Sequence, residues 1–483
     1  MRRPARGLLA PENRAVSLAV MASMALAFYN ATSVTAALPE IGAELGRVAL
    51  TQWVITVELL AAAIAVLAIG PFIDGSGVRR AYRLAIAGFA AASTLCAAAP
   101  TMEVLVAARL LQGLFTGSLI GTAVTCIGLA YGSDLRPRAY ALVASVWGVM
   151  GVGGPAVAAV LVSTLGWRSI FWVNLPVAAV AAAAGWNRVP AEAMAKAEPL
   201  DRRGLALMSA IAAALLVATS TLRWSSVALI ALAALLYGLY VRHARRRPGP
   251  IVHIAHITGR QWWPVHVVAV ASIAGGTGTS VFLPLYLRGG RGTSLSFAAF
   301  AVLWPTVGWA AASWASSKLQ ERIPAQQVVV IGSFILTASA VAVTAAAGVT
   351  APFPLLFAAF ACLGWGIGTI TTSSLALLQN QADPAEMGRV SSAHQFIRSL
   401  GWAYGAAVAG MVLFWVVERR AGDVEAVRGL LDDSAAAVDT TLADALSSAY
   451  AWSLGVLAAI SALTVPAAMV LSRSYNPDRI TRD

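Results

Sequence analysis

Two oppositely charged side chains, Glu58 and Arg109, stand inside long apolar stretches of this 483-residue sequence. A carboxylate can bind and release a proton, whereas an arginine stays charged. Charges are costly inside a membrane and are functional by default, and a neighbouring arginine favours the charged form of a carboxylate. We therefore expect a proton-binding site in which Glu58 titrates beside Arg109. The alternatives are a fixed ion pair that never titrates and, for Arg109, a side chain that reaches the outer interface.

Aromatic and polar side chains in other apolar stretches form a second candidate site. Aromatic walls with few fixed charges favour amphipathic, lipophilic ligands, including cations. For each aromatic side chain taken singly, packing against lipid is an equally good interpretation. The expected cavity lining consists of Tyr29, Gln112, Trp147, Trp304, Trp365, Gln395, Arg398 and Trp402.

The composition excludes a water-soluble protein. Apolar residues make up 59% of the chain and charged residues only 12%, against roughly a quarter in soluble domains. Lys196 and Lys318 are the only lysines, and neither belongs to a phosphate-binding G-K-[ST] loop, which argues against an ATP-driven pump. His253 and His256 have no further ligand nearby in the sequence, so no metal site is expected.

Stretches long enough to cross a bilayer as helices recur along the chain. An even number of spans places both termini on one side, and most of the 34 lysines and arginines fall on that side, which predicts cytoplasmic termini. Because the net charge of +12 is scattered over the inner loops, it indicates topology and contact with membrane lipid, and it does not support nucleic-acid binding. The fourteen expected spans are 15–37, 51–73, 82–99, 103–127, 140–163, 169–187, 204–222, 226–241, 264–287, 296–317, 327–347, 353–378, 391–416 and 447–471.

Several sequence motifs lie within these spans or in the loops between them. The loop after the second span reads G-P-F-I-D-G-S-G-V-R-R, with Gly70, Asp74, Gly77, Arg79 and Arg80 at its marked positions. Further motifs are R-x-x-Q-G from Arg109, the glycine-proline segment with Gly151, Gly154 and Pro155, and G-W-R-x-x-F-x-x-N-x-P from Gly166. This set resembles the major facilitator superfamily, and within it the fourteen-helix drug:proton antiporters.

The resemblance implies an all-α polytopic membrane protein with two six-helix halves, a two-helix insert and a substrate site between the halves. Asp74 is expected to accept hydrogen bonds from a neighbouring helix N-terminus while Arg79 and Arg80 pair across the inner loops, which latches the halves together. The alternative is a charge cluster that only sets topology. The expected divisions are an N-terminal segment 1–14, a first half 15–187, a linker with two extra helices 188–263, a second half 264–471 and a tail 472–483.

The expected proton site departs from the family. Its members usually carry an aspartate in the first helix, where this chain has Asn30, and commonly a tyrosine where this chain has Glu58. An amide does not carry a proton at physiological pH. At 1.5 Å per residue, the expected depths of Asn30, Glu58 and Arg109 agree within about 3 Å. We therefore expect Glu58 to take over the titrating role, with Asn30 as a hydrogen-bonding neighbour.

The resulting hypothesis is a proton-coupled exporter of lipophilic compounds in a bacterial cytoplasmic membrane, monomeric and without a cofactor. One alternative is a dedicated exporter or flippase of an endogenous lipid or metabolite with the same fold. Another is a non-transporting membrane sensor or scaffold. An enzyme is disfavoured because no nucleophile–base pair stands within the spans. The outer segment 418–446 receives no chemical assignment.

Overall fold

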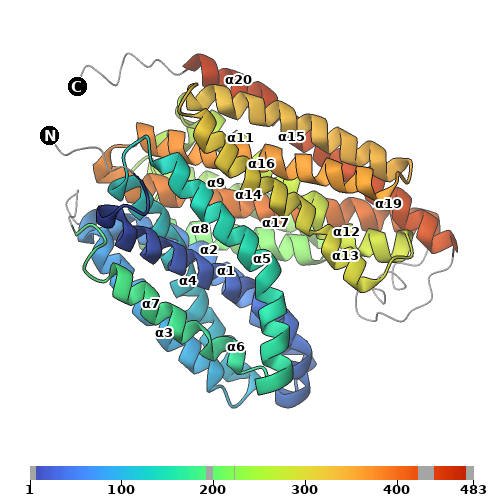
Figure 1. The fold of residues 1–483 in the computed structure, drawn as a ribbon, viewed down its shortest axis with the longest axis horizontal. Coiled ribbons are helices and arrows are strands. Elements are labelled where there is room, and N and C mark those ends of the chain that lie inside the picture. The colour runs from blue at the N-terminus through green and yellow to red at the C-terminus, as the bar shows by residue number, and fades with distance from the viewer. Residues whose placement is uncertain (1–6, 192–199, 222–223, 248, 422–439, 475–483) are drawn as a thin grey trace. The chain divides into compact units, whose positions relative to one another are not determined.

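In the computed structural model, residues 7–191, 200–221, 224–247, 249–421 and 440–474 are described, and within these ranges the chain is helical, without strands (Figure 1). The expected outer segment 418–446 lies largely outside these ranges. Contacts divide the chain into two compact units. The first unit comprises 1–214, 231–256 and 375–396, and the second comprises 215–230, 257–374 and 397–483.

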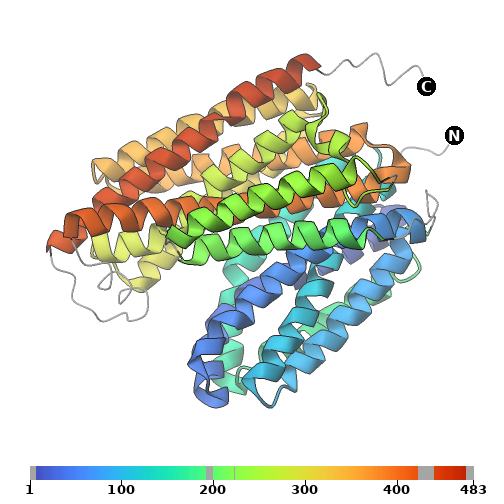
Figure 2. The ribbon, with the colours of Figure 1, turned by 180° about the vertical axis from the view of Figure 1, so that it is seen from behind.

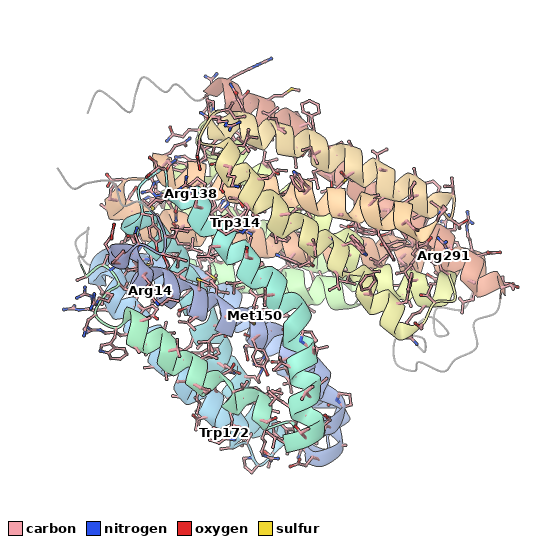
Figure 3. All side chains as sticks on the ribbon, in the orientation of Figure 1. Arg14, Arg138, Met150, Trp172, Arg291 and Trp314 are labelled. Atoms are coloured by element: carbon pink, nitrogen blue, oxygen red, sulfur yellow. The ribbon has the colours of Figure 1, made fainter. Side chains whose placement is uncertain are left out.

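The first unit contains the amino-terminal helices. Helix α2 packs against α4, α1 packs against α5 and α7, and α3 packs against α4 and α7 (Figures 1 and 2). Arg14, near the start of α1, and Trp172, at the end of α6, lie at opposite ends of this unit (Figure 3). The helices are α1 (Pro11–Leu45), α2 (Val48–Ser76), α3 (Val78–Ala97), α4 (Met102–Ala130), α5 (Arg136–Leu165), α6 (Ser169–Trp172) and α7 (Asn174–Gly185).

The second unit is built around α15, which packs against α19 and α20, while α11 packs against the same two helices. Its helices are α11 (Trp263–Val281), α12 (Leu283–Leu285), η1 (Tyr286–Gly290), α13 (Leu295–Ala301), α14 (Leu303–Leu319), α15 (Ala325–Gly348), α19 (Thr440–Ala462) and α20 (Thr464–Ser474). The helices that contribute residues to both units are α8 (Arg202–Thr221), α9 (Trp224–Ala244), α10 (Ile254–Thr258), α16 (Phe353–Gln381) and α17 (Met387–Ala421), and η2 (Pro384–Glu386) precedes α17 in the first unit.

Among the described residues, ten helices are long and apolar enough to cross a membrane. They correspond to ten of the expected spans. The other four expected spans, 82–99, 169–187, 204–222 and 296–317, also fall on helices. An all-helical membrane architecture is therefore shown.

Four expected spans differ from the sequence expectation because their helices are interrupted. The interruptions fall at Val173, Phe282, Val302 and Leu463. Each lies two or three residues before a proline, namely Pro176, Pro284, Pro305 and Pro466. A proline lacks the N–H that would bond to the carbonyl four residues earlier, and its ring pushes that carbonyl away. The breaks therefore have a local cause in the sequence.

Helices α2 and α4 approach each other unusually closely. A Cβ on Gly113 would collide with the Glu58 carbonyl oxygen, and one on Gly117 would collide with that of Ala62. Only glycine fits such an approach of two backbones. These two glycines therefore bring the middle of α2 beside the middle of α4, where the charged residues lie.

Candidate proton site and conformational latch

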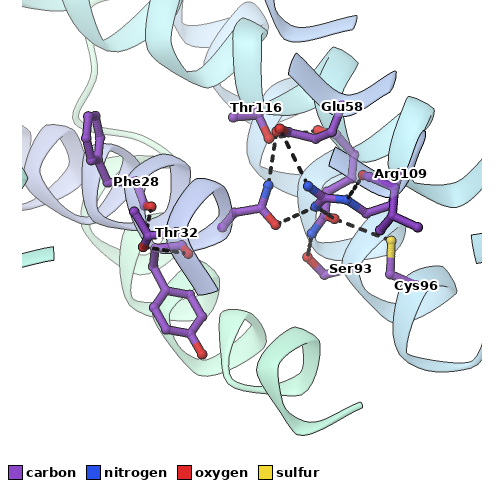
Figure 4. A network of polar contacts seen from close by, with 11 residues as sticks. Phe28, Thr32, Glu58, Ser93, Cys96, Arg109 and Thr116 are labelled. Atoms are coloured by element: carbon purple, nitrogen blue, oxygen red, sulfur yellow. Dashed lines mark hydrogen bonds and ion pairs between the residues drawn. The ribbon is translucent and has the colours of Figure 1, made fainter. Parts of the chain in front are cut away.

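Glu58, Arg109 and Asn30 form a closed triangle of contacts in the first unit (Figure 4). Arg109 Nη2 lies 3.5 Å from Glu58 Oε2, and Arg109 Nη1 donates to Asn30 Oδ1 at 2.8 Å. Asn30 Nδ2 donates to Glu58 Oε1 at 3.1 Å. All three residues are 1% exposed. The residues that the sequence predicted to lie at one depth therefore meet, with the amide bridging the acid and the cation.

The rest of the guanidinium is held by neighbouring groups. Arg109 Nε donates to the Val54 carbonyl at 3.0 Å and Nη1 also donates to Gln112 Oε1 at 2.6 Å. Gln112 in turn donates to Ser93 Oγ at 2.8 Å and accepts from the Cys96 thiol at 3.3 Å (Figure 4). Gln112, expected in the cavity lining, is thus a fully buried member of the charge network.

The network contains one acid and one permanent cation, which balance each other while Glu58 is ionised. A proton on Glu58 removes the attraction to Arg109 and leaves a buried, uncompensated positive charge. A site of this kind can couple proton binding to a change of conformation.

Asp74, near the carboxyl end of α2, binds the first turn of α17. Its Oδ1 accepts from the Gly388 N–H at 2.7 Å and its Oδ2 accepts from the Arg389 N–H at 3.0 Å. The carboxylate is buried and also benefits from the positive end of the α17 helix dipole. This is the geometry that the sequence predicted for the latch residue.

The other residues of this loop have separate positions. A Cβ on Gly70 would stand 2.7 Å from the Gly388 carbonyl oxygen, so only glycine allows α2 to meet α17 there. Gly77 ends α2 with φ +84°, a conformation that glycine adopts readily. Arg79 Nε donates to the Val189 carbonyl at 2.7 Å, and Arg80 is exposed. Of the two arginines that were expected to pair across the inner loops, Arg79 therefore contacts a backbone carbonyl.

A second set of contacts near the latch was not anticipated from the sequence. Arg136, at the start of α5, donates to the side chain of Asn380 at 2.6 Å and to the Gln379 carbonyl at 3.1 Å. The Gln379 side chain accepts from the Tyr140 hydroxyl at 2.6 Å and donates to the Val124 carbonyl at 2.9 Å. Neither amide belongs to a motif, so only their place at the end of a span could have pointed to them.

The glycine-proline segment of α5 packs on α1 at one point. A Cβ on Gly154 would stand 2.5 Å from Thr32 Oγ1. Gly151 is exposed, and Pro155 lies inside the helix. Of the two glycines, Gly154 is therefore the one that permits close helix packing.

The predicted cavity residues divide between the units. In the first unit, Tyr29 and Gln395 are buried and Trp147 packs on Phe28, with ring centroids 3.5 Å apart. In the second unit, the residues are Trp304, Trp365, Arg398 and Trp402.

Two of the four second-unit residues, Trp304 and Trp402, stack on other aromatic rings. Trp304 stacks on Phe357 with centroids 5.9 Å apart, and Trp402 stacks on Trp309 with centroids 6.4 Å apart. Trp365 and Trp402 are 39% and 42% exposed. Arg398 is half-buried on α17. The exposed indoles are available to lipid or to a ligand.

The G-W-R motif makes an exposed ion pair at the end of α5. Arg168 pairs with Glu44, whose other oxygen accepts from Trp167 Nε1 at 2.8 Å. The hydrogen bond from Arg168 holds the pKa of Glu44 below its usual value. This contact fixes the turn between α5 and α6.

Histidines of the linker contact Glu386, the last residue of η2. His256 Nε2 lies 3.1 Å from Glu386 Oε2, and His253 Nε2 lies 3.8 Å from Glu386 Oε1. Within the part of the chain that the structure describes, no group of three or more His, Cys, Asp or Glu side chains is arranged to hold a metal ion.

Comparison with known families and proteins agrees with this architecture. The sequence model of the Major Facilitator Superfamily matches residues 20–406. A probable multidrug-efflux transporter of Mycobacterium tuberculosis is 29% identical over 436 residues, covering 86% of this chain and 90% of the relative. An uncharacterized MFS-type transporter of the same organism is 28% identical over 428 residues, covering 86% of this chain, and this chain spans 62% of that relative's length.

A solved structure shows the same fold. The human organic anion transporter MFSD10 superposes with a TM-score of 0.64 and 16% sequence identity, covering 95% of this chain and 99% of that one. At this level of identity the likeness concerns the fold alone.

Proposed function

We propose that this chain, which belongs to the major facilitator superfamily, exports lipophilic or amphipathic compounds from the cytoplasm or the inner leaflet in exchange for protons. The observation that carries the proposal is the buried triangle of Glu58, Arg109 and Asn30. We place the protein in a bacterial cytoplasmic membrane as a monomer with fourteen spanning helices and both termini cytoplasmic. The insert of the two extra helices is formed by α8 and α9.

In this proposal Glu58 is the proton carrier. With Glu58 ionised, Arg109 and Asn30 hold α2, α4 and α1 together through side-chain contacts. A proton that arrives from outside neutralises Glu58 and frees the guanidinium to move, which shifts the equilibrium between outward-facing and inward-facing states. Entry of each proton is driven by the membrane potential with about 2.3 kcal/mol per 100 mV.

Asp74 and Gly70 act as the latch in this proposal. The Asp74 carboxylate binds two backbone N–H groups of α17, and Gly70 lets the two helices touch. Both contacts exist only while α2 and the start of α17 remain together. Release of the latch therefore accompanies the change to the state in which the cytoplasmic side is open.

The substrate class is inferred from two sources. The predicted cavity residues are mostly aromatic, and aromatic surfaces bind amphipathic and cationic ligands without a fixed hydrogen-bonding pattern. The Mycobacterium tuberculosis relative with 90% coverage is named a probable multidrug-efflux transporter. Both favour export of several lipophilic compounds over export of one hydrophilic metabolite.

Uptake of a panel of lipophilic dyes into inside-out proteoliposomes tests the proposal. We expect accumulation when the lumen is acidic and none when the pH is equal on both sides. The variant Glu58→Gln should lose the response to the gradient while still binding dye. Undiminished, gradient-driven transport by Glu58→Gln would overturn the role of Glu58, and dye transport that ignores the gradient in the wild type would overturn antiport.

A further inference from the structure

The first unit has an apolar groove that the proposed transport cycle does not use. Its volume is about 520 Å³, within the range of ligand sites in proteins, and it opens to one side. Only Ser76 and Ser118 contribute polar side chains, and the Ser118 hydroxyl is occupied by the Leu114 carbonyl of its own helix. The remaining walls come from α2, α3, α4, the start of α8 and the residue Leu200 before it. The large side chains among them are Ile64, Ile69, Phe72, Leu84, Leu114, Phe115, Leu200 and Leu205.

One end of the groove is rich in positive charge. Leu200 and Leu205 line it, and Arg202 and Arg203 lie between them in the sequence, both exposed. On the opposite wall the lining ends at Ser76, four residues before the exposed Arg80. A ligand lying in the groove would thus end at the chain segments that carry these three arginines.

The acid nearest in sequence to these arginines is turned away from them. Asp201 is buried and accepts from the N–H groups of Gly204 at 3.0 Å and Ile251 at 3.2 Å. Its Oδ1 also lies 2.8 Å from His243 Nε2. Burial alone would raise the pKa of Asp201, but these hydrogen bonds hold it below its usual value. The Asp201 carboxylate is therefore engaged by its own partners, and Arg202 and Arg203 are exposed.

We propose that this groove binds one acyl chain of an anionic phospholipid whose headgroup phosphate is held by Arg80, Arg202 and Arg203. The groove disfavours polar ligands because, apart from the Ser76 hydroxyl, its lining side chains offer them no free hydrogen-bonding partner. The charge at its inner end selects an anionic headgroup, which is available in the inner leaflet. This site assigns a role to the first extra helix, because the start of α8 forms one wall and supplies two of the three arginines.

Native mass spectrometry of the purified full-length protein with added phosphatidylglycerol or phosphatidylcholine tests the proposal. We expect one phosphatidylglycerol to be retained in preference to phosphatidylcholine. The double variant Arg202→Gln/Arg203→Gln should weaken phosphatidylglycerol binding about thirtyfold, since each arginine near a membrane surface contributes roughly a factor of five. Ala68→Phe, which fills the groove, should abolish retention, and Ser118→Phe tests the same space if Ala68→Phe does not fold.

A matched control removes two charges elsewhere. Lys318→Gln/Arg322→Gln takes two exposed cations from the last turn of α14 and the loop that follows it, in the second unit, and should change retention less than twofold. Equal retention of both lipids, equal losses in the two double variants, or full retention in a folded groove-filling variant would each overturn the proposal.

Discussion

Two buried carboxylates of the first unit, Glu58 and Asp74, lie in quite different surroundings. Glu58 lies beside a permanent cation and a side-chain amide, whereas Asp74 accepts hydrogen bonds from two backbone N–H groups. The partners of Glu58 belong to helices of the same amino-terminal bundle. The partners of Asp74 belong to the first turn of α17, far along the chain.

This difference separates two roles. The attraction between Glu58 and Arg109 depends on the charge of Glu58, so a proton changes it without any helix having moved. The contact of Asp74 depends on the position of α17, because both N–H groups from which it accepts belong to the first turn of that helix. In the proposed cycle, Glu58 senses the proton and Asp74 senses the position of α17.

The largest effect is expected for Arg109→Met. The change leaves Glu58 buried without a cation, which costs about 3–5 kcal/mol when one partner of a buried pair is removed. We expect a large fall in thermal stability in detergent and loss of transport. The double variant Glu58→Gln/Arg109→Met removes both charges and should recover most of the stability but none of the gradient-driven transport. A double variant as unstable as Arg109→Met alone would show that the two charges are not energetically linked.

A smaller and different effect is expected for Asp74→Asn. The amide offers one acceptor oxygen to two N–H groups and has no charge to interact with the α17 dipole, a loss of about 1–2 kcal/mol. The fraction of inward-open molecules should rise about tenfold. Distances between spin labels at the inner ends of α2 and α17 measure this fraction. The exposed Asp134→Asn is the control, and an unchanged fraction in Asp74→Asn would contradict the latch.

Gly70→Ala should act on the latch through sterics alone. The added Cβ would stand 2.7 Å from the Gly388 carbonyl oxygen, so α2 and α17 must separate slightly. We expect the same direction of shift as in Asp74→Asn, with the pH dependence of transport unchanged. Gly153→Ala is the matched control, because a Cβ there meets nothing within 4 Å. Equal behaviour of the two alanine variants would argue against close packing at Gly70.

The smallest effect on stability is expected for Glu44→Gln. Glu44 pairs with an arginine, as Glu58 does, but in an exposed position. Exposed ion pairs contribute little because water screens them. The pKa of Glu44 is lowered in the folded protein, so its contribution is present above the usual glutamate pKa of about 4.3 and is lost as pH falls below it. The melting temperature of Glu44→Gln should therefore lie slightly below that of the wild type near neutral pH, and this difference should vanish in acid. A large gap at neutral pH would contradict the contrast with Glu58.

The sequence predicted the helical architecture well because apolar length is a strong signal in a membrane protein. It also placed Asn30, Glu58 and Arg109 together from depth alone, since a helix advances regularly along the membrane normal. The interruptions before Pro176 and Pro284 were missed, although proline chemistry explains them. Proline within a span predicts a disturbed helix only when its packing is known, as the unbroken α5 around Pro155 shows.

The contact of Arg136 with Asn380 could not be predicted from the sequence, for another reason. The two residues lie 244 positions apart, and neither type nor spacing links them. The same limit applied to Gln112, whose membership of the charge network depends on the rotation of α4. Pairings of this kind arise from tertiary packing, which a single sequence does not encode in any local pattern.

The most direct test of the account is to count protons at the proposed site. Purified transporter in weakly buffered detergent solution is mixed with a transported dye, and the pH change gives the protons released per molecule. The account predicts release of about one proton by the wild type and by Asp74→Asn, and none by Glu58→Gln. Equal release by the wild type and Glu58→Gln would contradict the assignment of Glu58 as the proton carrier.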